Sequence, residues 1–184
     1  MIGAIRRAMR ESRWSGFAAA TAGIAALEFA LILPIMLILY LGGFETSEAF
    51  LINRKVTHAT SALGDLVAQS EELDDADIAN IFEAVAAIMN PYPSGAVQMI
   101  VSGVYVDEDG TATVVWSDAR NTTAHPADAE IDIPIDVVQI DTFIIVAEVS
   151  YVYTPQFGHT LVGDITLTDA FYLRPRLQNV VERT

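Results

Sequence analysis

The sequence predicts an α+β protein with a long N-terminal transmembrane helix, a second helix, and then an antiparallel β-sheet. Three observations support this prediction. An apolar stretch over residues 24–44 is long enough to span a bilayer. Apolar residues continue at helical spacing from residue 45 to residue 89. Beyond Gly95 they alternate with period two, which is typical of strands.

The composition excludes several classes of protein. The chain has 184 residues and a net charge of −14, of which residues 1–23 carry +3 and residues 24–184 carry −17. A body this acidic repels nucleic-acid phosphates, so nucleic-acid binding is not expected. Because the sequence contains no cysteine, a disulfide framework, thiolate catalysis and cysteine-ligated metals are excluded.

Residues 24–44 form the predicted membrane segment. As a helix they extend roughly 31 Å, about one hydrocarbon thickness. An ordinary secretory signal peptide is a weaker alternative, because the small residues suitable for its cleavage, at 18–22, precede the strongly apolar run. Four arginines before the segment are expected to stay cytoplasmic and to send residues 45–184 across the membrane. They are Arg6, Arg7, Arg10 and Arg13.

Two residues within this segment need an explanation. Glu28 places a carboxylate about one turn into an apolar helix, which is unfavourable unless the charge is paired or neutralised. One interpretation puts Glu28 at the cytoplasmic headgroups, where this penalty is small. Pro34 removes a backbone donor and is expected to kink the helix or to free the carbonyl of Ala30. A neighbouring helix or a local readjustment would then satisfy that carbonyl.

A second interpretation of Glu28 comes from its neighbours. Gly23 is followed five residues later by Glu28 and then by Phe29, an arrangement that resembles the prepilin peptidase site of type IV pilins, especially the Flp/Tad branch. The resemblance implies cleavage between Gly23 and Ile24, which leaves Glu28 at mature position five. There its carboxylate can meet the new α-amino group of a neighbouring subunit. An uncleaved membrane anchor is the alternative.

The resemblance extends over most of the chain, which is similar to TadE-like pilus-assembly proteins, the minor pseudopilins of the tight-adherence system. The similarity is most specific over residues 23–45, and it continues at residues 65–69, 116–117, 153–155 and 172–176. It implies a role in adherence and biofilm formation, with no cofactor and no small-molecule substrate. The implied partners are prepilin peptidase, other pseudopilins and Tad assembly components. The chain is far longer than a major Flp pilin, which favours a minor or accessory component.

These observations predict three parts: a basic prepilin-type leader at 1–23, an assembly helix at 24–44, and a periplasmic α+β domain at 45–184. The domain begins with a helix over residues 45–70, in which Gly64 is the weak point. A second helix follows, with Asp74 or Asp75 as its N-cap. The predicted apolar stripes are Phe50, Leu51, Val56, Ala59, Leu63, Leu66 and Val67 in the first helix, and Ile78, Ile81, Phe82, Val85, Ile88 and Met89 in the second.

Four strands are predicted, at residues 97–106, 111–117, 142–153 and about 165–174. The turn-rich residues 107–110 join the first two strands. Residues 118–136 are polar and irregular, and they are predicted to form a long surface connection. In the third strand one face consists of Phe143, Ile145, Ala147, Val149, Tyr151 and Tyr153. These last two tyrosines and Phe157 are interpreted as core, or as a partner surface where they are exposed.

Candidate catalytic or metal-binding residues are sparse. The histidines His58, His125 and His159 lack partners at metal-ligand spacing and are expected to be structural or on the surface. Residues 107–110 lack the alternating ligands of a calcium loop. Glu148 is interpreted either as a functional buried carboxylate or as a residue at a sheet edge or interface. The acidic residues at the start of the second helix, Asp74, Asp75 and Asp77, are expected to cap it.

Two functional hypotheses follow from these patterns. In the first, the chain is a processed pseudopilin whose helix packs with other pseudopilins. In the second, it is an uncleaved single-pass protein with a periplasmic binding or scaffolding domain. An enzyme is a distant third hypothesis, because no pattern brings together a nucleophile, a base and an orienting group.

Overall fold

The computed structural model describes residues 2–134, 139–159 and 163–184, and it describes the side chains of the first helix from Gly23 onward. The chain divides into two compact units, Met1–Thr46 and Ser47–Thr184. The first helix, α1, runs from Ile2 to Ala68 and therefore contributes to both units.

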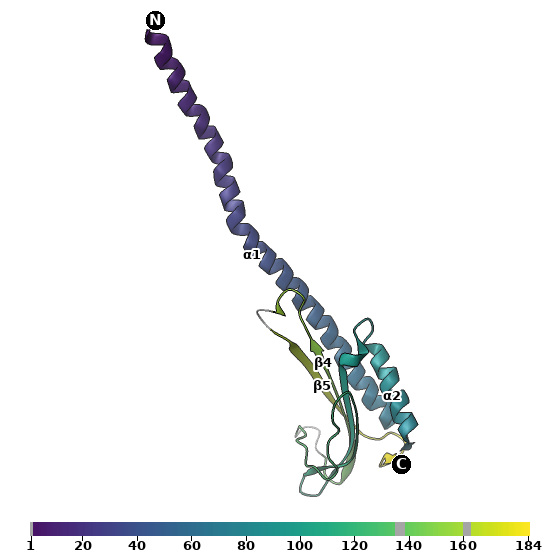
Figure 1. The fold of residues 1–184 in the computed structure, drawn as a ribbon. Coiled ribbons are helices and arrows are strands. Elements are labelled where there is room, and N and C mark those ends of the chain that lie inside the picture. The colour runs from purple at the N-terminus through teal and green to yellow at the C-terminus, as the bar shows by residue number, and fades with distance from the viewer. Residues whose placement is uncertain (1, 135–138, 160–162) are drawn as a thin grey trace. The chain divides into compact units, whose positions relative to one another are not determined.

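The second unit is an α+β domain, which confirms the predicted fold class (Figure 1). Helix α2, Asp75–Ile88, lies beside the last turns of α1. The main sheet is antiparallel with strand order β3-β2-β4-β5, and a two-stranded parallel sheet pairs β1 with β6. The strands are β1 Glu72–Leu73, β2 Val97–Val106, β3 Ala112–Arg120, β4 Thr142–Tyr153, β5 Ile165–Leu173 and β6 Glu182–Arg183.

The part of α1 in the second unit packs against the sheet through one face. This face begins at Ile52, which the sequence analysis did not include, and it continues through residues at three- and four-residue spacing. The prediction was wrong for Leu66, which is 38% exposed, and for Phe50 and Leu51, which are 67% and 55% exposed. Phe50 and Leu51 lie on other sides of the helix, because each residue turns it by about 100°. The buried positions are Ile52, Val56, Ala59, Leu63 and Val67.

Gly64 does not interrupt α1, although glycine weakens a helix interior. A Cβ at this position would lie 2.3 Å from Cδ1 of Leu173 and 3.4 Å from Cβ of Ala147. The missing side chain therefore lets strands β4 and β5 approach the helix backbone closely. This contact explains why glycine occupies a position where local propensity favours another residue.

Helix α2 begins as the sequence predicts. Asp74 is its N-cap, and an oxygen of its carboxylate accepts a hydrogen bond from the backbone N–H of Asp77 at 2.8 Å. The Asp77 carboxylate accepts the backbone N–H of Asp74 at 3.3 Å in return, which completes a capping box. The predicted apolar face is confirmed: Ile78, Phe82, Val85 and Met89 are buried, and Ile81 and Ile88 are partly buried against the same core.

Strand β4 separates two hydrophobic cores, because its successive side chains point to opposite faces. The predicted face from Phe143 to Tyr153 belongs entirely to the larger core, between the sheet and helices α1 and α2. Ile144 and Val146 on the other face belong to a smaller core. The two buried tyrosines, Tyr151 and Tyr153, are thus core residues as interpreted, whereas Phe157 is 56% exposed.

The prediction of a surface connection over residues 118–136 was wrong in part. Strand β3 continues to Arg120, and the segment after it returns along the free edge of β3. The backbone N–H of Val114 donates to the carbonyl of Ala129 at 2.9 Å, and Ile133, 7% exposed, covers the smaller core. Residues 135–138 lie outside the described residues. The apolar residues Ile131 and Ile133 were the sequence signal for this packing.

Candidate membrane and assembly helix

The part of α1 from Gly23 to Thr46 has the properties of a membrane or assembly helix. Among the described residues, α1 is the one helix long and apolar enough to cross a membrane, with a mean hydropathy of 2.5 in its most apolar window. None of that window is buried. Large apolar side chains are exposed around it, for example Leu31 at 64%, Ile38 at 69% and Tyr40 at 73%. Such a surface is stable only in lipid or against other apolar helices.

The predicted processing residues lie within two turns of this helix, at positions 23, 24, 28 and 29. Ile24 and Phe29 are 57% and 62% exposed, and Gly23 and Glu28 are also exposed. Ile24 and Glu28 are four residues apart, so they share one face of the helix about one turn from each other. A new α-amino group at Ile24 would consequently lie on the same face as the Glu28 carboxylate, about one turn before it. This arrangement suits a charge contact in a bundle of parallel helices.

Pro34 lies inside α1, and the helix continues on both sides of it. Since proline has no N–H, the carbonyl of Ala30 lacks its helical donor. Further along, the hydroxyl of Thr46 donates to the carbonyl of Gly42 at 2.7 Å. Hydroxyl side chains can satisfy backbone carbonyls within a membrane segment in this way. At Ala30, in contrast, the missing N–H of Pro34 leaves the backbone carbonyl available to a donor on a neighbouring helix.

The predicted topology residues lie in the N-terminal part of α1, whose backbone is helical. Their side chains, those of Arg6, Arg7, Arg10 and Arg13, lie outside the described residues. The orientation of the chain across the membrane accordingly remains a prediction from their charge.

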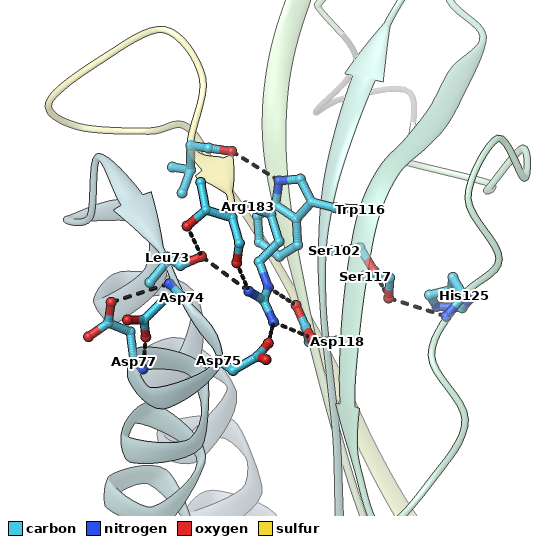
Figure 2. A network of polar contacts seen from close by, with 12 residues as sticks. Leu73, Asp74, Asp75, Asp77, Ser102, Trp116, Ser117, Asp118, His125 and Arg183 are labelled. Carbon is cyan, nitrogen blue, oxygen red and sulfur yellow. Dashed lines mark hydrogen bonds and ion pairs between the residues drawn. The ribbon is translucent and has the colours of Figure 1, made fainter.

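A second cluster of polar residues surrounds Arg183 on strand β6 (Figure 2). Its Nε and Nη2 donate to the two carboxylate oxygens of Asp118 at 2.8 and 3.1 Å. Nη2 also contacts Asp75 at 2.5 Å, and Nη1 donates to the carbonyl of Leu73 at 3.2 Å. These hydrogen bonds to carboxylates raise the pKa of Arg183 above its ordinary value, so the guanidinium stays charged.

The same segment is held by its backbone and by Trp116. The indole Nε1 donates to the carbonyl of Val181 at 2.9 Å, and Val181 is fully buried. The N–H of Glu182 donates to the carbonyl of Glu71 at 3.1 Å. Residues 181–184 thus join the loop between α1 and α2 to strand β3. The cluster therefore has a structural role, and we call residues 181–184 with their partners the Arg183 clasp. In the sequence it was indicated only by a single arginine near the end of the chain.

A polar chain on the other sheet face contains the pair His125 and Glu148. Nε2 of His125 lies 2.6 Å from Oε2 of Glu148, and both side chains are about one-third exposed. The Ser117 hydroxyl accepts the backbone N–H of His125 at 3.2 Å and shares a 2.8 Å hydrogen bond with Ser102. The histidine ring therefore contacts a carboxylate, while the serine contacts its backbone. This is not the geometry by which a histidine activates a serine nucleophile.

The sequence interpretation of Glu148 as a residue at a sheet edge was wrong. Strand β4 lies between β2 and β5, and Glu148 projects from this inner strand toward His125. The sequence gives no signal of this partnership, because residues 125 and 148 lie on segments joined only by the tertiary fold. Among the described residues there is no group of three or more histidines, cysteines or carboxylates arranged to hold a metal.

Two sequence segments that carry the family resemblance meet in the structure. Asp65 on α1 forms an ion pair with Nη2 of Arg176 at 2.5 Å. The backbone N–H of Arg176 also donates to the carbonyl of Ala68, the last residue of α1, at 2.8 Å. Both side chains are about half exposed, so the ion pair itself contributes little, whereas the backbone bond satisfies a helix-end carbonyl. The contact helps to attach the segment after β5 to α1.

Comparison with known proteins identifies part of α1. The family model described as TadE-like protein matches residues 23–63. The match begins at Gly23, includes Glu28, Phe29 and Pro34, and ends one residue before Gly64. No curated protein and no solved structure matches the chain. The family match agrees with the resemblance predicted from the sequence: over residues 23–63 this chain is similar to TadE-like proteins.

Proposed function

We propose that the chain is a minor pseudopilin of a Tad/Flp-type pilus, needed for pilus assembly, adherence and biofilm formation. The TadE-like match associates the chain with Tad pilus components. The observation that carries the finer proposal is the exposed apolar part of α1, whose side chains are described from Gly23 onward and which places Ile24 and Glu28 on one face. Such a helix serves first as a membrane anchor and then as the packing surface between subunits.

The proposal assigns a role to each part of the chain. Residues 1–23 are a basic leader that keeps the N-terminus cytoplasmic. Residues 24–44 hold the subunit in the inner membrane and later pack against other pseudopilins. Residues 45–184 form the periplasmic domain that makes specific contacts. Prepilin peptidase is the proposed processing enzyme, acting between Gly23 and Ile24.

The first test is the N-terminus of the protein from its native membranes. We expect a chain that begins at Ile24 in the presence of prepilin peptidase, and one that still carries the leader in its absence. Intact mass and N-terminal sequencing distinguish the two. A chain that retains the leader in both strains would instead support the second candidate, an uncleaved anchor with Glu28 at the headgroups and a periplasmic binding or scaffolding domain.

Replacing Gly23 with arginine is expected to block processing. The peptidase must accept a small residue before the cleaved bond, and a long charged side chain would not fit there. The measurement is the ratio of processed to unprocessed chain on an immunoblot. Gly16→Arg is the matched control, because it adds the same charge within the leader but away from the cleaved bond. A processed product from Gly23→Arg would contradict the assigned site.

Replacing Glu28 with alanine is expected to leave processing largely intact but to reduce piliation strongly. The carboxylate acts after cleavage, when it pairs with an α-amino group in the helix bundle. Surface pili are counted by electron microscopy, and processing is followed by mass. Glu11→Ala is the control, since it removes a carboxylate that leaves with the leader. Normal piliation in Glu28→Ala would remove the proposed role of this residue.

A further inference from the structure

The two arginines that follow strand β5 have different surroundings. Arg176 attaches its segment to α1 through Asp65 and the carbonyl of Ala68. Arg174 is exposed, and among the described residues it makes neither an ion pair nor a hydrogen bond. The contacts that hold this segment therefore leave the guanidinium of Arg174 available to another molecule.

A cation without a partner is unusual in so acidic a domain. Residues 45–184 contain 6 basic and 22 acidic side chains. Within the described part of the chain, four of these six cations have partners: Lys55, Arg120, Arg176 and Arg183. The other two, Arg54 and Arg174, are both exposed and have none. Exposure alone does not make a site, but Arg174 also lines a cavity.

This cavity, which we call the Arg174 cavity, has a volume of about 440 Å³ and lies where strands end or begin. Tyr105 is near the end of β2, and Thr142 and Phe143 begin β4. Arg174 directly follows β5. The remaining lining comes from Asp141 and from the segment that leads from β5 toward β6. Because β2 pairs with β4, Tyr105 is held opposite Phe143 at this end of the sheet.

The polar groups of the Arg174 cavity favour a ligand with one negative charge. The guanidinium of Arg174 can donate two parallel N–H bonds to a carboxylate, and the side-chain amides of Gln178 and Asn179 add further donors. Asp141 also lines the cavity, and the hydroxyl of Tyr105 donates to its Oδ1 at 2.6 Å. Because Asp141 is itself an anion, it repels a singly charged carboxylate less than a doubly charged phosphate.

The apolar groups of the cavity favour a carboxylate that belongs to a peptide. Phe143, which is 5% exposed, lines the cavity together with Pro175 and Val180. A volume of about 440 Å³ lies within the range of ligand sites and is far larger than one carboxylate needs. An apolar residue next to the carboxylate would fill the remainder. A run of several acidic residues is disfavoured, because the net charge of the domain is negative.

We propose that the Arg174 cavity binds a single carboxylate of a partner protein, carried by a peptide segment with apolar neighbours. The carboxylate belongs to an acidic side chain or to a chain end, since both present the same group to a guanidinium. Its use as a docking site between components rests on the proposed function, in which this domain makes specific contacts. The binding itself involves residues within Ser47–Thr184 alone and does not require cleavage after Gly23. The two proposals can therefore fail separately.

The first test measures the binding of short peptides to the full-length chain in detergent by saturation-transfer NMR. The probes are acetyl-Val-Glu-Val-amide, its glutamine analogue, and acetyl-Val-Val with a free carboxyl end. We expect the glutamine analogue to bind about tenfold more weakly than the better of the two carboxylate peptides, a factor that corresponds to one charged hydrogen bond. The better of those two identifies a side chain or a chain end as the source. Micelles without protein measure the background.

Two outcomes of this test would overturn the proposal. One is equal binding, or no binding, of all three peptides, because recognition would then not involve the negative charge. The other is displacement of the bound peptide by inorganic phosphate at a lower concentration than by acetate, because the cavity would then prefer a phosphate to a carboxylate.

Variants test whether the binding depends on Arg174. Arg174→Gln is expected to weaken binding of the carboxylate peptide about tenfold. Arg174→Lys should bind with an affinity between this variant and the wild type, because lysine keeps the charge but not the planar fork of donors. Circular dichroism of each variant should match that of the wild type, since no hydrogen bond or ion pair among the described residues is lost.

The matched control is Arg54→Gln, which removes one positive charge from the same domain at an exposed position outside the lining of the Arg174 cavity. We expect this variant to bind the peptide as the wild type does. An equal loss in Arg54→Gln and Arg174→Gln would overturn the proposal, because binding would then follow the net charge of the domain. Binding by Arg174→Gln at the wild-type level would overturn it as well.

Discussion

Replacing Gly103 with alanine is expected to lower the free energy of unfolding by about 3 kcal/mol, at the upper end of overpacking effects. A Cβ at Gly103 would lie 2.3 Å from Nε1 of Trp116 and 2.5 Å from Cζ of Phe143. These atoms belong to large rings that are 9% and 5% exposed, so neither can move without disturbing the core. Moving Trp116 would also weaken its hydrogen bond to the carbonyl of Val181.

The position of Gly103 prevents an easy adjustment of the backbone. It lies on β2, which is paired with β3 on one side and β4 on the other, and the register with β3 shifts between Gly103 and Val104. Trp116 is the register partner of Gly103 on β3, and its indole lies against the glycine. Neighbouring strands fix the backbone on both sides, so the overlap must be relieved by the rings.

The measurement is urea unfolding of the full chain in detergent, followed by circular dichroism and tryptophan fluorescence. Gly95→Ala is the matched control, because a Cβ there meets nothing within 4 Å. We expect this control to change stability by less than about 1 kcal/mol. Similar stabilities for Gly103→Ala and Gly95→Ala would show that the Trp116 contact is not a fixed feature of the fold.

Replacing Arg183 with methionine is expected to lower the free energy of unfolding by about 2 kcal/mol, less than for a fully buried pair. The side chain of Arg183 is 17% exposed and that of its main partner Asp118 is 25% exposed. Methionine keeps much of the apolar contact but leaves the Asp118 carboxylate without its guanidinium. The carbonyl of Leu73 also loses a donor. Strand β6 should then separate from β1 more easily.

The two carboxylates around Arg183 provide a matched comparison. Asp75 is 96% exposed at its side chain, so Asp75→Asn should change stability by less than about 0.5 kcal/mol. Asp118→Asn should lower the free energy of unfolding by more than Asp75→Asn does. The double variant Asp118→Asn/Arg183→Met should lose much less stability than the sum of the two single losses. Urea unfolding measures stability, and hydrogen exchange of residues 181–184 reports separation of the clasp. Additive effects would contradict a direct Arg183–Asp118 interaction.

Local sequence patterns were sufficient to predict most helices and strands of the domain. The capping box at Asp74 and the apolar face of α2 follow from residues within one or two turns of each other. The alternation in β4 predicted its larger-core face in full, because a strand alternates regardless of what covers it. The family resemblance could likewise be recognised from the short segment around Glu28.

Other features depend on contacts between residues that are distant in sequence. From the sequence, Gly64 is a weak point of α1. Its reason is the close contact with Leu173, a residue more than 100 positions later in the chain. The partnership of His125 with Glu148 joins two segments 23 residues apart, and that of Arg183 with Asp118 joins residues 65 apart. No periodicity signals such pairs. The same is true of Phe50 and Leu51, whose exposure depends on which side of α1 meets the sheet.

The sequence by itself determined the fold class, the apolar helix and its TadE-like segment, because each depends on composition, spacing or a short motif. The tertiary structure alone decided which face of α1 is buried, how β6 is clasped by Arg183, and that Glu148 projects from an inner strand. The physical reason is that local propensities act between near neighbours along the chain. Burial and charge pairing act between whichever surfaces the folded chain brings together.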